Sequence, residues 1–145
     1  MSAEKKVQGY NCMIVLSPKG DEWLMCKRRK DPYKGLYNLV GGKIEEGEDG
    51  CHAAYRELFE ETSITAEQIS LVRLMTFDYP LDGCYVEVWS GQLAAPTEVS
   101  GDENDLEWLP LTEDFFDMKK YAGEGNIGHM LEILKLHPEL YTINA

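Results

Sequence analysis

The chain lacks any apolar run near the roughly 20 residues that a helix needs to span a bilayer. It also lacks internal repeats, low-complexity tracts and linker-like segments. These absences argue against an integral membrane protein and a repeat array. With 145 residues, 43% hydrophobic and 28% charged, the composition suits one globular domain, expected over residues 1–145. The first residues, MSAEKKVQGY, lack the apolar segment of a signal peptide, so we expect a cytoplasmic protein.

Cysteine is sparse, and none of the four cysteines belongs to a C-x-x-C pair. Cys12, Cys26 and Cys51 stand among apolar or small residues. A metal-thiolate site or a disulfide framework needs a pairing that this spacing does not show. We therefore expect buried or half-buried free thiols.

Positive charge is scarce as well, because 14 Lys and Arg face 26 Asp and Glu, for a net charge of −12. Bulk electrostatics would not draw such a chain to nucleic acid polymers or to anionic membranes. Binding of phosphate groups then requires a local cationic site. A small Lys/Arg cluster, or divalent metal ions held on carboxylates, would supply it.

The pattern of apolar residues and turn signals predicts a sheet with helices. Strands are predicted over residues 7–17 and 22–29 as one hairpin, at 36–40, over 69–79 and 84–93 as a second hairpin, and at 106–111. Helices are predicted over residues 48–62, 114–120 and 126–136. This order predicts an α+β protein, an α/β/α sandwich with a mixed sheet. The helix over 48–62 and the C-terminal helix would pack on it.

The stretch over residues 41–64, GGKIEEGEDGCHAAYRELFEETSI, holds six glutamates and one aspartate against one lysine and one arginine. In the predicted helix, Glu57, Glu60 and Glu61 stand at i, i+3 and i+4, within an arc of roughly 100° on one face. Three carboxylates at the edge of an apolar stripe suit hard cations such as Mg²⁺ or Mn²⁺. A solvated acidic helix face is the alternative.

The same stretch resembles the signature of the Nudix family, G-x5-E-x7-R-E-U-x-E-E-x-G-U, in which U is a bulky aliphatic residue. The matching positions are Gly42, Glu48, Arg56, Glu57, Leu58, Glu60, Glu61 and Ile64. The one departure is Ser63, where the pattern has glycine. It falls on the C-terminal cap of the helix, where glycine eases a left-handed turn, and it touches no ligand position.

The resemblance implies the Nudix fold and a hydrolase of nucleoside diphosphates linked to another moiety. It implies Mg²⁺ as cofactor, for which Mn²⁺ can substitute. Carried over position by position, Glu57, Glu60 and Glu61 would ligate the metal together with the backbone carbonyl of Gly42. Either Glu60 or Glu61 would double as general base, and Arg56 would orient a glutamate.

Two residues outside the signature are further candidates by the same resemblance. Glu103, in the acidic loop before the last strand, would be an extra metal ligand or base, and a solvated acidic turn is the alternative. Arg28, at the end of the second strand, would meet the substrate phosphates; plain surface charge is the alternative. Four aromatic residues can stack on a base but are more often core residues: Tyr10, Phe77, Tyr79 and Tyr85.

Asn38 and Asn126 resemble asparagines near the base pocket of MutT-type enzymes, and an amide can read a base edge with both a donor and an acceptor. For Asn126 a plain helix cap is the alternative. These matches favour a nucleoside triphosphate, such as the oxidised purine 8-oxo-dGTP, cleaved to the monophosphate and pyrophosphate. An ADP-ribose or dinucleoside polyphosphate hydrolase, a non-catalytic nucleotide-binding module and a homodimer stay open.

Overall fold

The structure is a computed structural model that describes residues 7–145. Within this range the strands are β1 (Gln8–Leu16), β2 (Glu22–Lys27), β3 (Tyr37–Asn38), β4 (Val72–Tyr79), β5 (Cys84–Gln92) and β6 (Asp105–Pro110). The helices are α1 (Gly50–Thr62), α2 (Asn126–Lys135) and the short 3₁₀ helix η1 (Pro80–Asp82).

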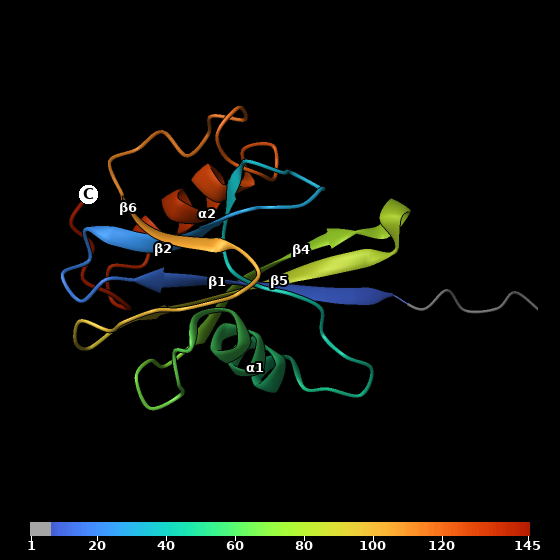
Figure 1. Cartoon of the computed structure of the whole chain (residues 1–145), viewed down its shortest axis with the longest axis horizontal. Helices are drawn as coiled ribbons and strands as arrows, with labels where there is room; N and C mark the ends of the chain where they lie inside the picture. Colours follow the sequence, from blue (N-terminus) through green and yellow to red (C-terminus); the bar gives the residue numbers. More distant parts are fainter. Residues whose placement is uncertain (1–6) are drawn as a thin grey trace, which may run out of the picture.

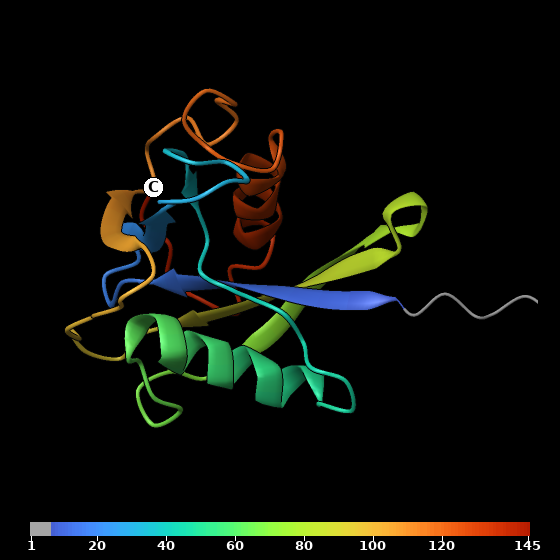
Figure 2. The ribbon, with the colours of Figure 1, turned by 45° about the vertical axis from the view of Figure 1, so that its right-hand side comes forward.

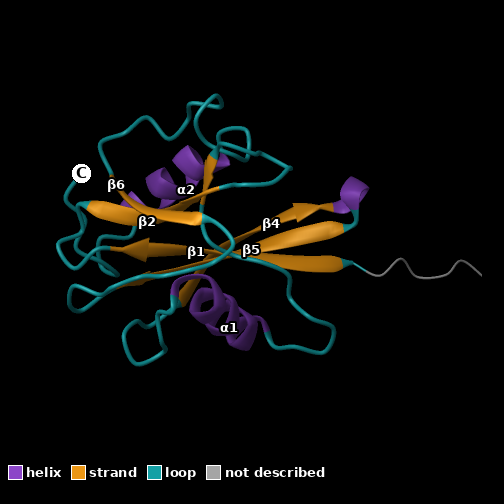
Figure 3. Cartoon of the chain, in the orientation of Figure 1, coloured by secondary structure: helices purple, strands orange, loops and turns teal. Residues whose placement is uncertain are grey.

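The strands form one mixed sheet in the order β3-β2-β1-β5-β4, and β6 pairs with β2. β1 and β5 run parallel, from Gln8 opposite Cys84 to Leu16 opposite Gln92, whereas the other neighbours are antiparallel. α1 lies on one face of the sheet and α2 on the other (Figures 1 and 2). The layers are easiest to follow by element type (Figure 3). The predicted α/β/α sandwich is confirmed.

The two faces of the sheet bury separate sets of side chains. Because successive side chains of a strand point to opposite faces, Ile14 and Met13 of β1 enter different layers. Ile14 packs with Leu131 and Leu134 beneath α2, and Met13 packs with Leu58 beneath α1. All five are buried. The apolar stripe of each helix therefore finds a matching strand surface, which fixes where both helices stand.

The boundaries of α1 come from local capping. The carboxylate of Asp49 accepts a hydrogen bond from the backbone N–H of His52 at 3.4 Å, so the helix begins at Gly50, two residues later than predicted. At the other end Ser63 adopts a left-handed conformation with φ of 67°, and its N–H donates to the carbonyl of Phe59. The signature glutamates thus occupy the last turns of the helix.

The helix predicted over residues 114–120 is wrong, because this segment forms separate turns. The carboxylate of Asp114 accepts from the N–H of Phe116 at 3.1 Å, a local bond that competes with helical pairing. Phe115 is buried, with its ring 4.7 Å from that of Trp23 and 4.8 Å from that of Tyr121. Packing of this one ring therefore decides the path of the segment.

The cysteines are free thiols, as expected: Cys26 is buried and the others are half-buried. Burial raises the pKa of both Cys12 and Cys26 to about 12. Across residues 7–145 we find no helix with the length and apolar character needed to cross a membrane.

Candidate active site

β1, a central strand, holds the glycine pair Gly41–Gly42 between the bridges Met13–Val40 and Tyr10–Lys43. The N–H of Asn11 donates to the carbonyl of Gly42 at 2.9 Å, and the N–H of Gly42 donates to Oδ1 of Asn11 at 2.9 Å. A Cβ on Gly41 would overlap the backbone of Asn11, and a Cβ on Gly42 would overlap the carboxylate of Glu57. Glycine is required at Gly41 because the backbone of Asn11 approaches so closely; at Gly42 a Cβ would displace the Glu57 carboxylate.

Two glutamates of α1 face this glycine pair. Glu61 accepts a hydrogen bond from the N–H of Gly41 at 3.2 Å, and the carboxylate of Glu57 lies against Gly42. Burial, with the charges of Glu57 and Glu103 added, raises the pKa of Glu61 to about 7. Burial also raises the pKa of Glu57. The two carboxylates therefore lie close together where solvent stabilises their negative charge poorly.

Arg56 binds three carboxylates of the signature. Its Nε and Nη2 bind the two oxygens of Glu48 at 2.7 and 2.8 Å, and Nη1 lies 3.0 Å from Glu57 and 3.3 Å from Glu60. Nη2 also donates to the carbonyl of Lys43 at 3.1 Å. The guanidinium holds the pKa of Glu48 well below its usual range. Arg56 thus fixes the loop before α1 onto the helix.

The oxygen atoms beside the glycine pair are of the type that Mg²⁺ and Mn²⁺ prefer. Glu57 and Glu61 fit a divalent cation by this chemistry, and burial raises the pKa of both carboxylates although Arg56 pairs with Glu57. A carbonyl such as that of Gly42 keeps a second lone pair after accepting from Asn11. Glu60 instead turns toward Arg56, with 55% of its side chain exposed. Accordingly, no three His, Cys, Asp or Glu side chains within residues 7–145 are grouped for a metal ion in this arrangement.

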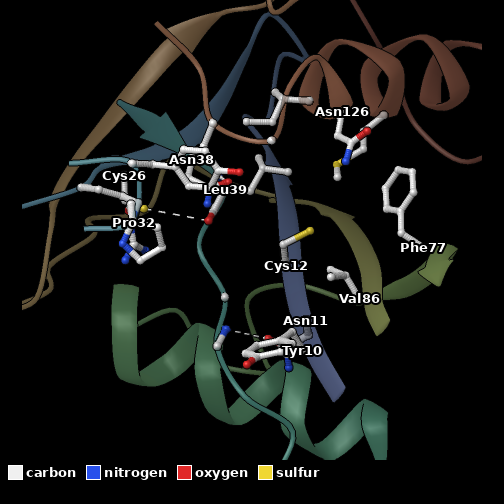
Figure 4. A pocket seen from close by; sticks show the side chains of 18 of the residues that line it. Tyr10, Asn11, Cys12, Cys26, Pro32, Asn38, Leu39, Phe77, Val86 and Asn126 are labelled. Atoms are coloured by element: carbon white, nitrogen blue, oxygen red, sulfur yellow. Dashed lines mark hydrogen bonds between the residues drawn. The ribbon is translucent and has the colours of Figure 1, made fainter. Parts of the chain in front are cut away.

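A cavity of about 630 Å³ opens beside Glu61. Glu61 and the glycine pair form its acidic end, and Asn38, Phe77 and Asn126 also line it. Asn126 lies beside Phe77, and Asn38 lies beside Leu39 and Cys26 (Figure 4). The cavity therefore brings together the predicted substrate residues and one predicted catalytic glutamate. Of the other predicted residues, Arg28 and Gly42 also line it, whereas Glu57, Glu60, Arg56 and Glu103 lie outside its lining.

Hydrogen bonds orient the predicted substrate residues. Nε of Arg28 donates to the carbonyl of Pro32 at 2.6 Å. Oδ1 of Asn38 accepts from the N–H of Leu39 at 2.8 Å. Nδ2 of Asn126 donates to the hydroxyl of Tyr79 at 2.9 Å.

The cap alternative for Asn126 is wrong. The N-cap of α2 is Gly125, in a left-handed conformation, and no side chain caps this helix. The amide of Asn126 is therefore part of the cavity wall.

Sequence patterns miss some of the residues around the cavity. Of the four candidate aromatics, Tyr10, Phe77 and Tyr79 line it and Tyr85 does not. Asn11 is not among the predicted residues, although a polar residue inside the apolar strand sequence is a visible signal. It is only 4% exposed, and its Nδ2 has no hydrogen-bond partner among the described residues.

Comparison with known proteins identifies the family of this chain. The family model described as the NUDIX domain matches residues 7–127. The NAD-capped RNA hydrolase NPY1 of Saccharomyces cerevisiae is 31% identical over 119 residues, which cover 77% of this chain and 31% of that protein. The chain thus spans about a third of the length of this relative.

Two shorter relatives align over more of their own length. The RNA pyrophosphohydrolase of Pelagibacter ubique is 27% identical over 135 residues, covering 86% of this chain and 82% of the relative. The oxidized purine nucleoside triphosphate hydrolase of Mus musculus is 26% identical over 106 residues, covering 72% of this chain and 67% of the relative.

Solved structures share the fold over nearly the whole chain. An Ap4A hydrolase of C. elegans, in a binary complex, superposes with a TM-score of 0.73 at 25% identity, covering 92% of this chain and 98% of that chain. A bifunctional NMN adenylyltransferase/ADP ribose pyrophosphatase of Francisella tularensis, complexed with AMP and Mn ion, gives a TM-score of 0.72 at 26% identity. There the coverage is 92% of this chain and 43% of the other.

Proposed function

From the premise that this chain belongs to the Nudix hydrolase family, we propose that it hydrolyses a nucleoside triphosphate to the monophosphate and pyrophosphate with Mg²⁺. One observation carries the proposal: a cavity of nucleotide size is lined by Glu61 and the glycine pair, by the amides of Asn38 and Asn126, and by aromatic rings that include Phe77 and Tyr79. Its acidic end suits metal-bound phosphates, and its amides and rings suit a base.

At the acidic end, Glu57 and Glu61 would hold the metal ion, with Glu60 joining after release from Arg56. When bound, the ion supplies positive charge that stabilises the phosphoryl oxygens in the transition state. Without a cation, burial raises the pKa of Glu61 to about 7; a cation held by Glu57 and Glu61 would lower it and favour the ionised form, which a metal ligand or a general base must present. Arg28 would contact a phosphate at the cavity wall.

Two amides of the cavity lining, those of Asn38 and Asn126, can bind a base. After Oδ1 of Asn38 accepts from the N–H of Leu39, its NH₂ group can donate to a ligand. After Nδ2 of Asn126 donates to Tyr79, its oxygen can accept from a ligand. A base edge with one acceptor and one donor would satisfy both. An oxidised purine such as 8-oxo-dGTP has such an edge.

The relatives support this substrate class and name a second candidate. The mouse relative acts on oxidized purine nucleoside triphosphates, by its name, and it aligns with most of the chain. The C. elegans Ap4A hydrolase aligns over nearly its full length, which favours a dinucleoside polyphosphate as the alternative. In that case the first nucleoside would occupy the same cavity.

A hydrolysis screen tests the proposal. Canonical and oxidised nucleoside triphosphates, ADP-ribose and dinucleoside polyphosphates are offered with Mg²⁺, and the products are identified by mass. We expect a monophosphate and pyrophosphate from one triphosphate. Faster cleavage of a dinucleotide would establish the second candidate. No hydrolysis of any compound by a metal-loaded protein would refute an enzymatic role and favour a nucleotide-binding module.

A further inference from the structure

The loop that leads into β6, residues 100–105, is fixed at its first end to the C-terminus of α1. Oγ of Ser63 donates to the carbonyl of Ser100 at 3.1 Å and lies 3.0 Å from its hydroxyl. A Cβ on Gly101 would overlap the backbone carbonyl of Glu61, so the loop touches the helix there. The side chain that departs from the family signature thus binds the loop, beside the carbonyl of Thr62, which accepts from the N–H of Ser100 at 3.0 Å.

The second end of this loop is fixed by Arg29, which follows β2. Its backbone N–H donates to Oδ1 of Asn104 at 3.1 Å, and Nη1 donates to the carbonyl of Asp102 at 3.0 Å. Nη2 donates to the carboxylate of Asp105 in an ion pair. One residue therefore contacts three of the last four positions of the loop, and the uncontacted one is Glu103.

Glu103 stands between these two anchors, next to the acidic end of the cavity. Gly101, two residues before it, lies against the backbone carbonyl of Glu61. The neighbouring Asn104 lines the cavity itself. The position of the loop therefore sets how close a third carboxylate comes to Glu57 and Glu61.

We propose that Arg29 and Ser63 are positioning residues, which hold the loop so that the Glu103 carboxylate faces the site formed by Glu57 and Glu61. This inference rests on the proposed function and deepens it. Glu103 would then help Glu57 and Glu61 to hold the metal ion, and Arg29 and Ser63 would act only through Glu103.

The contacts of Arg29 are suited to holding the loop in place more than to stabilising the folded protein. Side chains of Arg29 and Asp105 are 49% and 66% exposed, and exposed ion pairs contribute little to folding. The guanidinium instead provides a planar fork that binds two acceptors in fixed directions, which the ammonium of lysine does not. Loss of Arg29 should therefore move the loop without unfolding the protein.

The test combines Arg29→Ala with Glu103→Gln in the full chain. We expect each single variant to lower kcat at least about tenfold, with little change in KM, because a misplaced group loses rate before binding. The double variant should be no slower than Glu103→Gln alone, because both changes remove one interaction. Arg29→Ala should also weaken Mn²⁺ binding, followed by EPR titration, and speed amide exchange over residues 100–105. Arg29→Lys should recover part of kcat.

Arg73→Ala is the matched control, because Arg73 is an exposed arginine with one long ion pair, 3.8 Å from Glu87. It should keep wild-type kcat. Asp105→Asn removes a partner of Arg29 without touching the cavity and serves as a second variant if Arg29→Ala does not fold. The inference would be overturned if the double variant lost kcat by the product of the two single losses. It would also be overturned if Arg29→Ala showed faster amide exchange with an unchanged kcat.

The inference and the proposed function fail in different ways. Wild-type hydrolysis by both Glu57→Gln and Glu61→Gln would refute the proposed function. Loss of hydrolysis in those two variants, with wild-type rates in Glu103→Gln and Arg29→Ala, would refute the positioning role alone.

Discussion

Glu61 accepts a hydrogen bond from the backbone N–H of Gly41, so the last signature glutamate and the glycine pair form one wall of the cavity. The contact holds a half-buried carboxylate in the lining of the cavity, where burial raises its pKa.

Glu61→Gln should lower kcat by about 10²–10⁴-fold, the usual contribution of a positioned acid or base. The fold should persist, because the glutamine oxygen can still accept from the N–H of Gly41. Steady-state kinetics and a thermal melt check both expectations. A rate near that of the wild type would remove Glu61 from the reaction.

The raised pKa of Glu61 predicts how stability depends on pH in metal-free protein. The pKa is about 7 in the folded protein, against an ordinary value of 4.5, so the folded state binds the proton more tightly than the unfolded state. The contribution of Glu61 to stability is therefore largest below pH 4.5 and is lost as the pH rises to 7. Urea unfolding in EDTA at about pH 5 and about pH 8, on either side of that pKa, should show a larger loss in wild type than in Glu61→Gln. Equal losses would contradict the raised pKa.

Ser63 offers a test of strain against hydrogen bonding. Its φ of 67° is costly for a residue with a Cβ, whereas its hydroxyl binds Ser100. Ser63→Gly removes both the strain and the bond; Ser63→Ala removes only the bond. The glycine variant should be more stable than the alanine variant by about 1 kcal/mol. Urea unfolding measures the difference, and equal stability would show that the left-handed turn is not strained.

Asn126→Ala should raise KM and reduce discrimination between bases, with a smaller change in kcat, because in the proposed complex its amide binds the base and not the reacting phosphate. The measurement is kcat/KM for an oxidised and a canonical triphosphate. Tyr79→Phe, which removes the partner of that amide, should change the same ratio in the same direction. An unchanged ranking of substrates in both variants would exclude base reading by Asn126.

Much of the fold is predictable because its signals are local. The alternation of apolar residues locates β1, β2, β4 and β5, and the helical spacing around Leu58 locates α1. The prediction over residues 114–120 fails because a buried ring, Phe115, overrides the helical composition of the segment. No local pattern reveals such a contact.

The site divides in the same way. The spacing of Glu57, Glu60 and Glu61 on α1 is written in the sequence. Arg29, by contrast, meets Asn104 across 75 positions of the chain, and only the pairing of β2 with β6 brings them together. The sequence likewise does not reveal that Glu60 turns toward Arg56, because a flexible side chain can pair with more than one partner.

The parallel pairing of β1 with β5 has a consequence for synthesis on the ribosome. Leu16 finds its partner, Gln92, only after most of the chain has been made. Until then β1 keeps one open edge and apolar residues on both sides, the condition in which nascent chains associate wrongly. Slowed translation before residue 92 should therefore lower the yield of folded protein, whereas slowed translation after residue 135, where α2 ends, should not.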